Sequence, residues 1–177
     1  MKLTKFLSIV ALTITVLSLS GCNKEPDPIV LTGSWQLDST STFLQIFYNP
    51  TFASENPRAI QFLKDNKEKI LKEIKKPEII QFVEPNIVNF VYKSSSTPPL
   101  TGTFEQFEIY VSIKNSIFPN GITGASNNEK LEIYYDKTYM LGILNSILTP
   151  QDDSQETFST LIEAFDGVGV YTRAKLL

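Results

Sequence analysis

Carboxylates are the side chains of this sequence best suited to acid–base chemistry, because the chain has no histidine and a single cysteine, Cys22. Histidine is the commonest general base near neutral pH and the commonest metal ligand. Its absence excludes Ser-His-Asp and Cys-His catalysis and histidine-based zinc sites, and one cysteine cannot build a thiolate metal cluster. The sequence also has neither a glycine-rich dinucleotide fingerprint nor a phosphate-binding loop.

A pair of carboxylates, as glycosidases use, needs no histidine. The candidates are Glu105, Glu108, Glu129, Glu132 and Asp136. Glu105 and Glu108 are three residues apart on a predicted strand, where side chains alternate between faces, so they are expected to point in opposite directions. We therefore expect these acids to be solvated and the protein not to be an enzyme.

A short acidic loop contains Asp152, Asp153, Ser154 and Glu156, whose oxygens are of the kind that binds calcium. The loop lacks the glycine at position six and the glutamate at position twelve of an EF-hand loop. Acidic residues also stabilise a helix N-terminus through the helix dipole. We expect an ordinary loop that begins a helix, with no metal and no cofactor.

Five aromatic residues fall on neighbouring predicted elements: Tyr134, Tyr135, Tyr139, Phe90 and Tyr92. They either line a ligand cavity or a sugar-stacking surface, or they fill the core, because large side chains occupy the interior of a small barrel.

A lysine-rich segment precedes them, with Lys64, Lys67, Lys69, Lys72, Lys75 and Lys76. Its exposed face either contacts anionic lipid headgroups or is simply solvated. The whole chain has 16 basic and 19 acidic residues, which argues against nucleic acid as a partner.

The elements that position these residues are mostly strands. A period of two with β-branched and aromatic residues begins after Pro77, and Pro85-Asn86 separates the first two strands of this region. Apolar residues at helical spacing, begun by Asn56-Pro57, predict one long helix over about 57–76, and a second short helix is predicted over about 154–165. The predicted strands are 31–37, 78–83, 87–92, the long alternating segment 101–113, the hairpin 131–135 with 138–144, and 168–176.

Within the segment 101–113, Phe107, Ile109, Val111 and Ile113 are expected to share one face. The pattern as a whole predicts a mainly β fold of α+β type, which is a small antiparallel barrel or a strongly curved sheet with helices over an edge or an opening.

The N-terminus reads as an export signal. Two lysines in the first five residues precede an apolar stretch of 14 residues, Phe6 to Leu19. At about 1.5 Å per residue, a helix of this stretch reaches roughly 21 Å, which is short of a hydrocarbon core of about 30 Å. A permanent transmembrane helix is therefore not expected.

The sequence Leu19-Ser20-Gly21-Cys22 resembles the lipobox of bacterial lipoproteins. The resemblance implies that Cys22 is alkylated by a diacylglycerol, becomes the first mature residue and anchors the protein in a membrane. It also implies that Asn23, which is not the aspartate of an inner-membrane retention signal, favours the outer membrane of a Gram-negative bacterium. We expect a signal peptide over 1–21, a flexible tether over 22–30 and one domain over 31–177.

Gly33-Ser34-Trp35 opens that domain and resembles the Gly-X-Trp signature of lipocalins and related calycin-like families. The resemblance implies an antiparallel barrel with the tryptophan packed across one end. It also implies a non-enzymatic protein that binds a small apolar or amphipathic ligand in the barrel. The alternative is an accessory module with a solid core that docks a protein or a glycan, which exposed aromatic residues on one patch would support.

Overall fold

The structure is a computed structural model that describes residues 31–93 and 98–174. The predicted signal peptide 1–21, the lipobox with Cys22 and the tether 22–30 lie outside the described residues.

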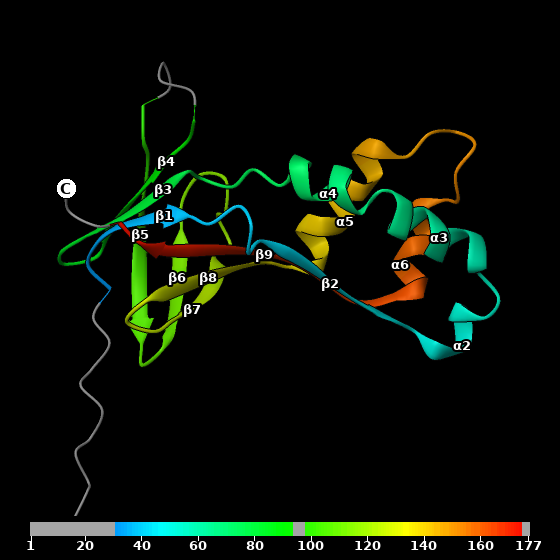
Figure 1. The fold of residues 1–177 in the computed structure, drawn as a ribbon, viewed down its shortest axis with the longest axis horizontal. Helices are drawn as coiled ribbons and strands as arrows, with labels where there is room; N and C mark the ends of the chain where they lie inside the picture. Colours follow the sequence, from blue (N-terminus) through cyan, green and yellow to red (C-terminus); the bar gives the residue numbers. More distant parts are fainter. Residues whose placement is uncertain (1–30, 94–97, 175–177) are drawn as a thin grey trace, which may run out of the picture.

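Eight strands form a closed antiparallel barrel, drawn on the left of Figure 1. Neighbours in the barrel follow one another along the chain from β3 to β9, and pairing of β9 with β1 closes the ring. This confirms the predicted mainly β fold and antiparallel barrel. The barrel strands are β1 Gly33–Leu37, β3 Ile79–Val83, β4 Ile87–Val91, β5 Leu100–Phe107, β6 Tyr110–Lys114, β7 Ile122–Ser126, β8 Lys130–Tyr135 and β9 Ile162–Arg173.

The last strand, β9, is long enough to pair both within the barrel and with a strand outside it. The second half of β9 pairs with β8 and β1 in the barrel, and its first half pairs with β2, Phe43–Tyr48. The link from β1 to β2 is ordered by Asp38, whose carboxylate accepts hydrogen bonds from the hydroxyls of Thr40 and Ser41 at 2.6 Å. These bonds lower the pKa of Asp38 to about 2. The β2–β9 ribbon leaves the barrel and carries the helices (Figure 1).

The helices gather at the far end of this ribbon, on the right of Figure 1, and they are α2 Pro50–Ala53, α3 Pro57–Asp65, α4 Lys67–Glu73, α5 Lys137–Ile147 and α6 Gln155–Leu161. The single helix predicted over 57–76 is wrong, because the chain breaks at Asn66. The side-chain amide of Asn66 donates to the carbonyl of Phe62 at 3.0 Å, a local bond that competes with the helical ladder. Pro57 does begin α3, as predicted.

The predicted hairpin of 131–135 with 138–144 is also wrong, because its second half is helix α5. Asp136 caps this helix, and its carboxylate accepts the N–H of Tyr139 at 2.9 Å. Met140, Leu144 and Ile147 are buried at helical spacing.

The second predicted helix, 154–165, is too long. Helix α6 ends at Leu161, and β9 begins at Ile162 rather than at 168. Phe158, Leu161 and Phe165 are all buried, as an apolar stripe requires, but they belong to two elements. Periodicity alone did not show this change of element because the run stays apolar through the junction.

Large side chains fill the barrel interior. Trp35, Ile80, Phe90, Ile113 and Leu131 are at most 1% exposed. A Cβ added to Gly124 would lie 2.9 Å from Ile133 Cδ1 and 3.1 Å from Val111 Cγ1, and one added to Gly169 would lie 3.2 Å from Tyr171 Cε2. A methyl group at Gly124 would clash with the barrel wall, and one at Gly169 would require the Tyr171 ring to shift slightly.

The antiparallel meander places successive turns at opposite ends of the barrel. At the helix end, Ile74 and Met140 come so close that a Cβ on Gly167 would lie within 2.8 Å of each. At the other end, here called the entry end, turns 84–86, 108–109 and 127–129 join neighbouring strands. Leu31 is buried there, and its N–H donates to Gln106 Oε1 on β5 at 3.0 Å.

Candidate functional site

A groove of about 530 Å³ runs across the outer face of strands β5 to β8. Strand register explains which side chains reach it. Glu105 lies opposite Ser112, Ser112 opposite Thr123, and Thr123 opposite Tyr134, so these four residues form one row across the wall. Because side chains alternate along a strand, the row faces outward while its neighbours face the core.

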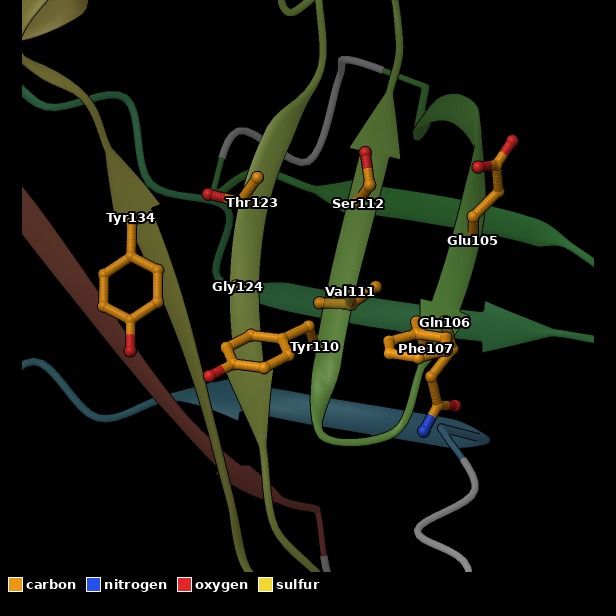
Figure 2. A pocket seen from close by; sticks show the side chains of 9 residues that line it. All are labelled: Glu105, Gln106, Phe107, Tyr110, Val111, Ser112, Thr123, Gly124 and Tyr134. Atoms are coloured by element: carbon orange, nitrogen blue, oxygen red, sulfur yellow. The ribbon is translucent and has the colours of Figure 1, made fainter.

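Aromatic rings border this groove. Phe107 and Tyr110 are cross-strand partners, and their side chains are 73% and 56% exposed. Figure 2 shows these two rings side by side, with Tyr134 on β8 beside Tyr110. Phe107, Tyr110 and Tyr134 therefore form an aromatic patch on the outer face, which is the kind of surface expected for an accessory module. Phe47 and Phe52 are exposed aromatic residues outside this patch.

Polar groups of the groove supply hydroxyls and one carboxylate. Ser112 and Thr123 contribute hydroxyls, Glu105 the carboxylate, and the lining contains no lysine or arginine. The Tyr134 hydroxyl donates to Glu132 at 2.8 Å. Burial, followed by this bond and the nearby carboxylate charge, raises the pKa of Tyr134 to about 12. The groove therefore offers ring faces with hydrogen-bonding groups, and it favours neutral or cationic ligands over anions.

The turn between β5 and β6 creates the aromatic pair. The predicted continuous segment 101–113 is wrong, because the chain reverses at Glu108 and Ile109, and Phe107 then pairs with Tyr110. Glu108 has a φ of 52°, a left-handed conformation that favours glycine or asparagine. The reversal also corrects the predicted shared face: Val111 and Ile113 are buried, while Phe107 and Ile109 are exposed.

The five candidate carboxylates are spread over strands β5 and β8, two turns and the start of α5. Glu105 and Glu132 share the outer face but sit on β5 and β8, so three strand spacings, roughly 14 Å, separate them. Glu108 and Glu129 occupy turns, and Asp136 is the cap of α5. Among the described residues, no three acids gather closely enough to hold a metal ion.

The acidic loop serves the helix that follows it. Asp152 accepts hydrogen bonds from the N–H and hydroxyl of Thr149 at 2.7 and 2.8 Å, and these bonds lower its pKa. Ser154 caps α6 by accepting the N–H of Thr157, and Glu156 lies in its first turn. Asp153 completes the loop. The arrangement is that of the ordinary helix start that the sequence predicts.

The predicted aromatic cluster is divided between two faces. Tyr134 faces the groove, whereas Tyr135 and Phe90 point into the barrel. Tyr139 lies on α5 rather than on a strand, and its ring is 5.3 Å from that of Tyr135. Tyr92 follows β4 at the helix end and is half-buried.

Three tyrosine hydroxyls inside the barrel form a second feature of interest. The hydroxyls of Tyr135 and Tyr171 are buried beside each other and interact, and that of Tyr92 is buried nearby; among the described residues the three hydroxyls have no other hydrogen-bond partner. Burial raises the pKa of Tyr135, and the neighbouring Tyr171 adds to the increase. A buried hydroxyl that does not use all of its hydrogen-bonding capacity is costly, so this position favours a small hydrogen-bonding guest.

The lysine-rich segment lies on α3, α4 and the residues after them, away from the entry end (Figure 1). Its lysines are exposed except Lys76, which is half-buried. Burial lowers the pKa of Lys76, whose ammonium group donates to the carbonyl of Leu71. The helix position makes a solvated face the simpler interpretation of this segment.

Sequence reasoning missed part of the groove. It considered Tyr134 and Glu105, and it placed Tyr110 and Ser112 on the face opposite Val111 and Ile113, but it did not place Phe107 on the outer face and did not consider Thr123. The alternation of 110–114 contained the signal, because Tyr110 and Ser112 lie out of phase with the buried Val111 and Ile113. What could not be seen was the turn that moved Phe107 to the same side.

Comparison of the chain with protein-family models, curated proteins and solved structures finds no match. Within the part of the chain that the structure describes, no helix has the length and apolar character needed to cross a membrane.

Proposed function

We propose that this protein is a non-enzymatic binding lipoprotein of the cell envelope that holds a neutral or cationic glycan in its outer groove. The observation that carries the proposal is the groove itself, where Phe107 and Tyr110 present rings to solvent and the half-buried Tyr134 lines the wall beside them. A sugar ring has C–H faces that pack on an aromatic ring and hydroxyls that hydrogen-bond to groups such as Ser112 and Glu105. The groove lies on the closed part of the sheet, whose free strand edge is that of β2, so a partner in the groove is not added as a β-strand.

Anchoring and location follow from the N-terminal motif. Lipid on Cys22, after removal of residues 1–21, would attach the protein stably, because two or more acyl chains hold a protein far better than one. Asn23 supports the outer membrane of a Gram-negative bacterium. The buried Trp35 after Gly33 and the antiparallel barrel support a lipocalin-like classification.

The glycan assignment is tested by calorimetric titration of the mature chain with three oligosaccharide probes. A neutral chito-oligosaccharide and its cationic deacetylated form are expected to bind, and an acidic polygalacturonate oligosaccharide is not. Replacement Tyr110→Ala should weaken binding about tenfold, or 1.4 kcal/mol, by removing one ring face. The matched control is Phe47→Ala, which removes a ring that is 58% exposed on β2. Absence of binding to all three probes, or equal effects of the two variants, overturns the assignment.

The anchor has a separate test. The variant Cys22→Ala should yield soluble or unprocessed protein, and metabolic labelling with a radioactive fatty acid should be lost. If this variant is cleaved and fractionates with membranes like the wild type, the lipoprotein assignment is wrong.

A second candidate function is binding of a small amphipathic ligand inside the barrel, and the buried hydroxyls of Tyr92, Tyr135 and Tyr171 favour it, because they keep unused hydrogen-bonding capacity. The packing around Gly124 and Gly169 counts against a large guest. Native mass spectrometry of the purified mature chain separates the cases: a co-purifying mass that is lost in Tyr135→Phe supports the internal ligand, and a bare polypeptide mass excludes a stably held one.

A further inference from the structure

Strand β2 has one edge that no other strand of the described residues covers. The barrel closes where β1 pairs with β9, whereas β2 lies at the end of the sheet and pairs with β9 alone. Figure 1 shows the β2–β9 ribbon leaving the barrel toward the helices. A free edge presents a row of unpaired N–H and C=O groups to which the strand of another chain can add.

Hydrogen bonding at the end of β2 shows which main-chain groups face this free edge. The N–H of Asn49 donates to the carbonyl of Leu161, on the β9 side, at 2.7 Å. The direction of hydrogen bonding alternates from residue to residue along an antiparallel strand. Leu44, Ile46 and Tyr48 therefore direct their N–H and C=O groups away from β9, toward the free edge.

The charged and proline residues that usually protect a sheet edge are missing from β2. Residues 39–54 contain no lysine, arginine, aspartate or glutamate, and the strand itself contains no proline. The irregularity in its pairing lies on β9, where Glu163 is the extra residue between the partners of Phe47 and Tyr48. The free edge of β2 is therefore regular and uncharged, which natural sheets rarely leave unpaired.

We propose that β2 pairs with β2 of a second copy of this chain, antiparallel and around a two-fold axis at Ile46. The result is a continuous sheet in the order β9–β2–β2–β9. In this register Ile46 lies opposite Ile46 of the partner subunit, and Leu44 lies opposite the partner's Tyr48. The outward-facing residues of the two strands then exchange about six hydrogen bonds, because each directly opposed pair of this type exchanges two.

A second copy fits this edge because β2 is complementary to itself. Gln45 would lie opposite the partner's Phe47 on the face that does not pack on the core, where Gln45 is exposed and Phe47 is 58% exposed. Like charges directly opposite each other destabilise a strand pair, and this pairing brings none together. The acids of the ribbon, Glu163 and Asp166, lie on β9, so three strand spacings, roughly 14 Å, separate them from those of the partner subunit.

Analytical ultracentrifugation of the mature chain, residues 22–177 with Cys22→Ser, tests for the dimer. The parent chain should pass from monomer to dimer as its concentration rises, as expected for a contact of modest size. Gln45→Lys with Phe47→Lys places lysines opposite each other and should weaken dimerisation at least tenfold. The matched control is Thr101→Lys with Thr103→Lys, which adds two exposed lysines at the same spacing on β5 and should leave dimerisation unchanged. Circular dichroism verifies that both double variants are folded.

Disulfide cross-linking in the same Cys22→Ser background tests the register. Gln45→Cys mixed with Phe47→Cys should cross-link on oxidation, because the Cα atoms of a directly opposed pair without hydrogen bonds lie about 4.5 Å apart. Either variant alone should cross-link several-fold more slowly, because two copies of the same residue lie diagonally across the pair. A mixture of Gln45→Cys with Thr103→Cys measures the background of random collisions.

A chain that stays monomeric at its highest soluble concentration overturns the self-pairing and leaves the edge to a strand of another protein. A dimer that withstands the two lysines on β2, or that is weakened equally by those on β5, overturns its placement at β2. Faster cross-linking by Gln45→Cys alone than by the mixture overturns the two-fold axis at Ile46. The measurements contain neither lipid nor oligosaccharide, so their outcome is independent of the anchor and of the glycan assignment.

Discussion

The two faces of strands β5 to β8 use the same kinds of residue in opposite ways. Inside, Phe104 packs edge-to-face on Phe82 with ring centroids 4.9 Å apart, and only 9% of it is exposed. Outside and three residues along the same strand, Phe107 is 73% exposed. The inner ring has a structural role, because burial of a phenylalanine stabilises the core. The outer ring contributes little to folding, which makes it a candidate for binding.

The largest expected effect comes from truncating each ring in turn. Phe104→Ala should lower the free energy of unfolding by about 3–5 kcal/mol, because it removes buried surface and leaves a cavity. Phe107→Ala should change it by no more than about 0.5 kcal/mol, as surface substitutions do. Urea unfolding followed by circular dichroism measures both. A cost for Phe107→Ala close to that for Phe104→Ala would mean that the outer face is part of the core.

A smaller effect on the free energy of unfolding tests how tightly the barrel wall between the two faces is packed. Gly124→Ala should cost about 1–3 kcal/mol, because its Cβ would lie 2.4 Å from the carbonyl oxygen of Glu132 and must push the wall apart. Gly142→Ala on α5 is the matched control, with no atom within 4 Å of the new Cβ. It should stabilise the protein by about 0.5–1 kcal/mol through helix propensity.

If Gly124→Ala is instead tolerated like Gly142→Ala, the barrel wall is compliant. An interior that yields to a methyl group could also yield to a guest, so that result would move the balance toward an internal ligand. Thermal melting of Gly124→Ala and Gly142→Ala under the same conditions distinguishes a rigid barrel wall from a compliant one.

Neighbouring tyrosines on β8 sharpen the comparison further, because their hydroxyls should have opposite effects on stability. Tyr135 faces inward, and its hydroxyl is fully desolvated with only the Tyr171 hydroxyl within reach, so Tyr135→Phe should raise the free energy of unfolding by about 1 kcal/mol. Tyr134 faces outward and bonds to Glu132, so Tyr134→Phe should lower it by about 0.5 kcal/mol. A destabilising Tyr135→Phe would show that a water or a ligand satisfies the inner hydroxyl in solution.

The sequence predicts the barrel strands best where local pattern and tertiary environment agree. Pro85-Asn86 between two alternating runs predicted β3 and β4 closely, and Gly33 to Leu37 was placed in the first strand. At 138–144 the apolar residues also fit a strand, and the decisive signal was the cap at Asp136, a single side chain. Apolar runs shorter than about eight residues do not distinguish the two periods.

The candidate site was less predictable than the fold, because it depends on which residues of each strand point outward and which point into the barrel. Which residues of 101–113 face outward follows from the position of one turn, and the turn contains no glycine, proline or asparagine. A shift of one residue in register exchanges the faces of a strand. The position of Phe107 beside Tyr110 could therefore be assigned only once Glu108 was seen in the left-handed region.

The turn at Glu108 and Ile109 gives the smallest expected effect. It determines which residues of β5 and β6 share the outer face. A side chain such as glutamate is disfavoured at a φ of 52°, whereas asparagine adopts this conformation readily. Glu108→Asn should therefore raise the free energy of unfolding by about 0.5 kcal/mol, measured as a higher urea midpoint at unchanged slope. Oligosaccharide binding should stay as in the parent chain, because the pairing of Phe107 with Tyr110 is kept. A stabilised variant that loses binding would show instead that strain at Glu108 holds the two rings in their binding arrangement.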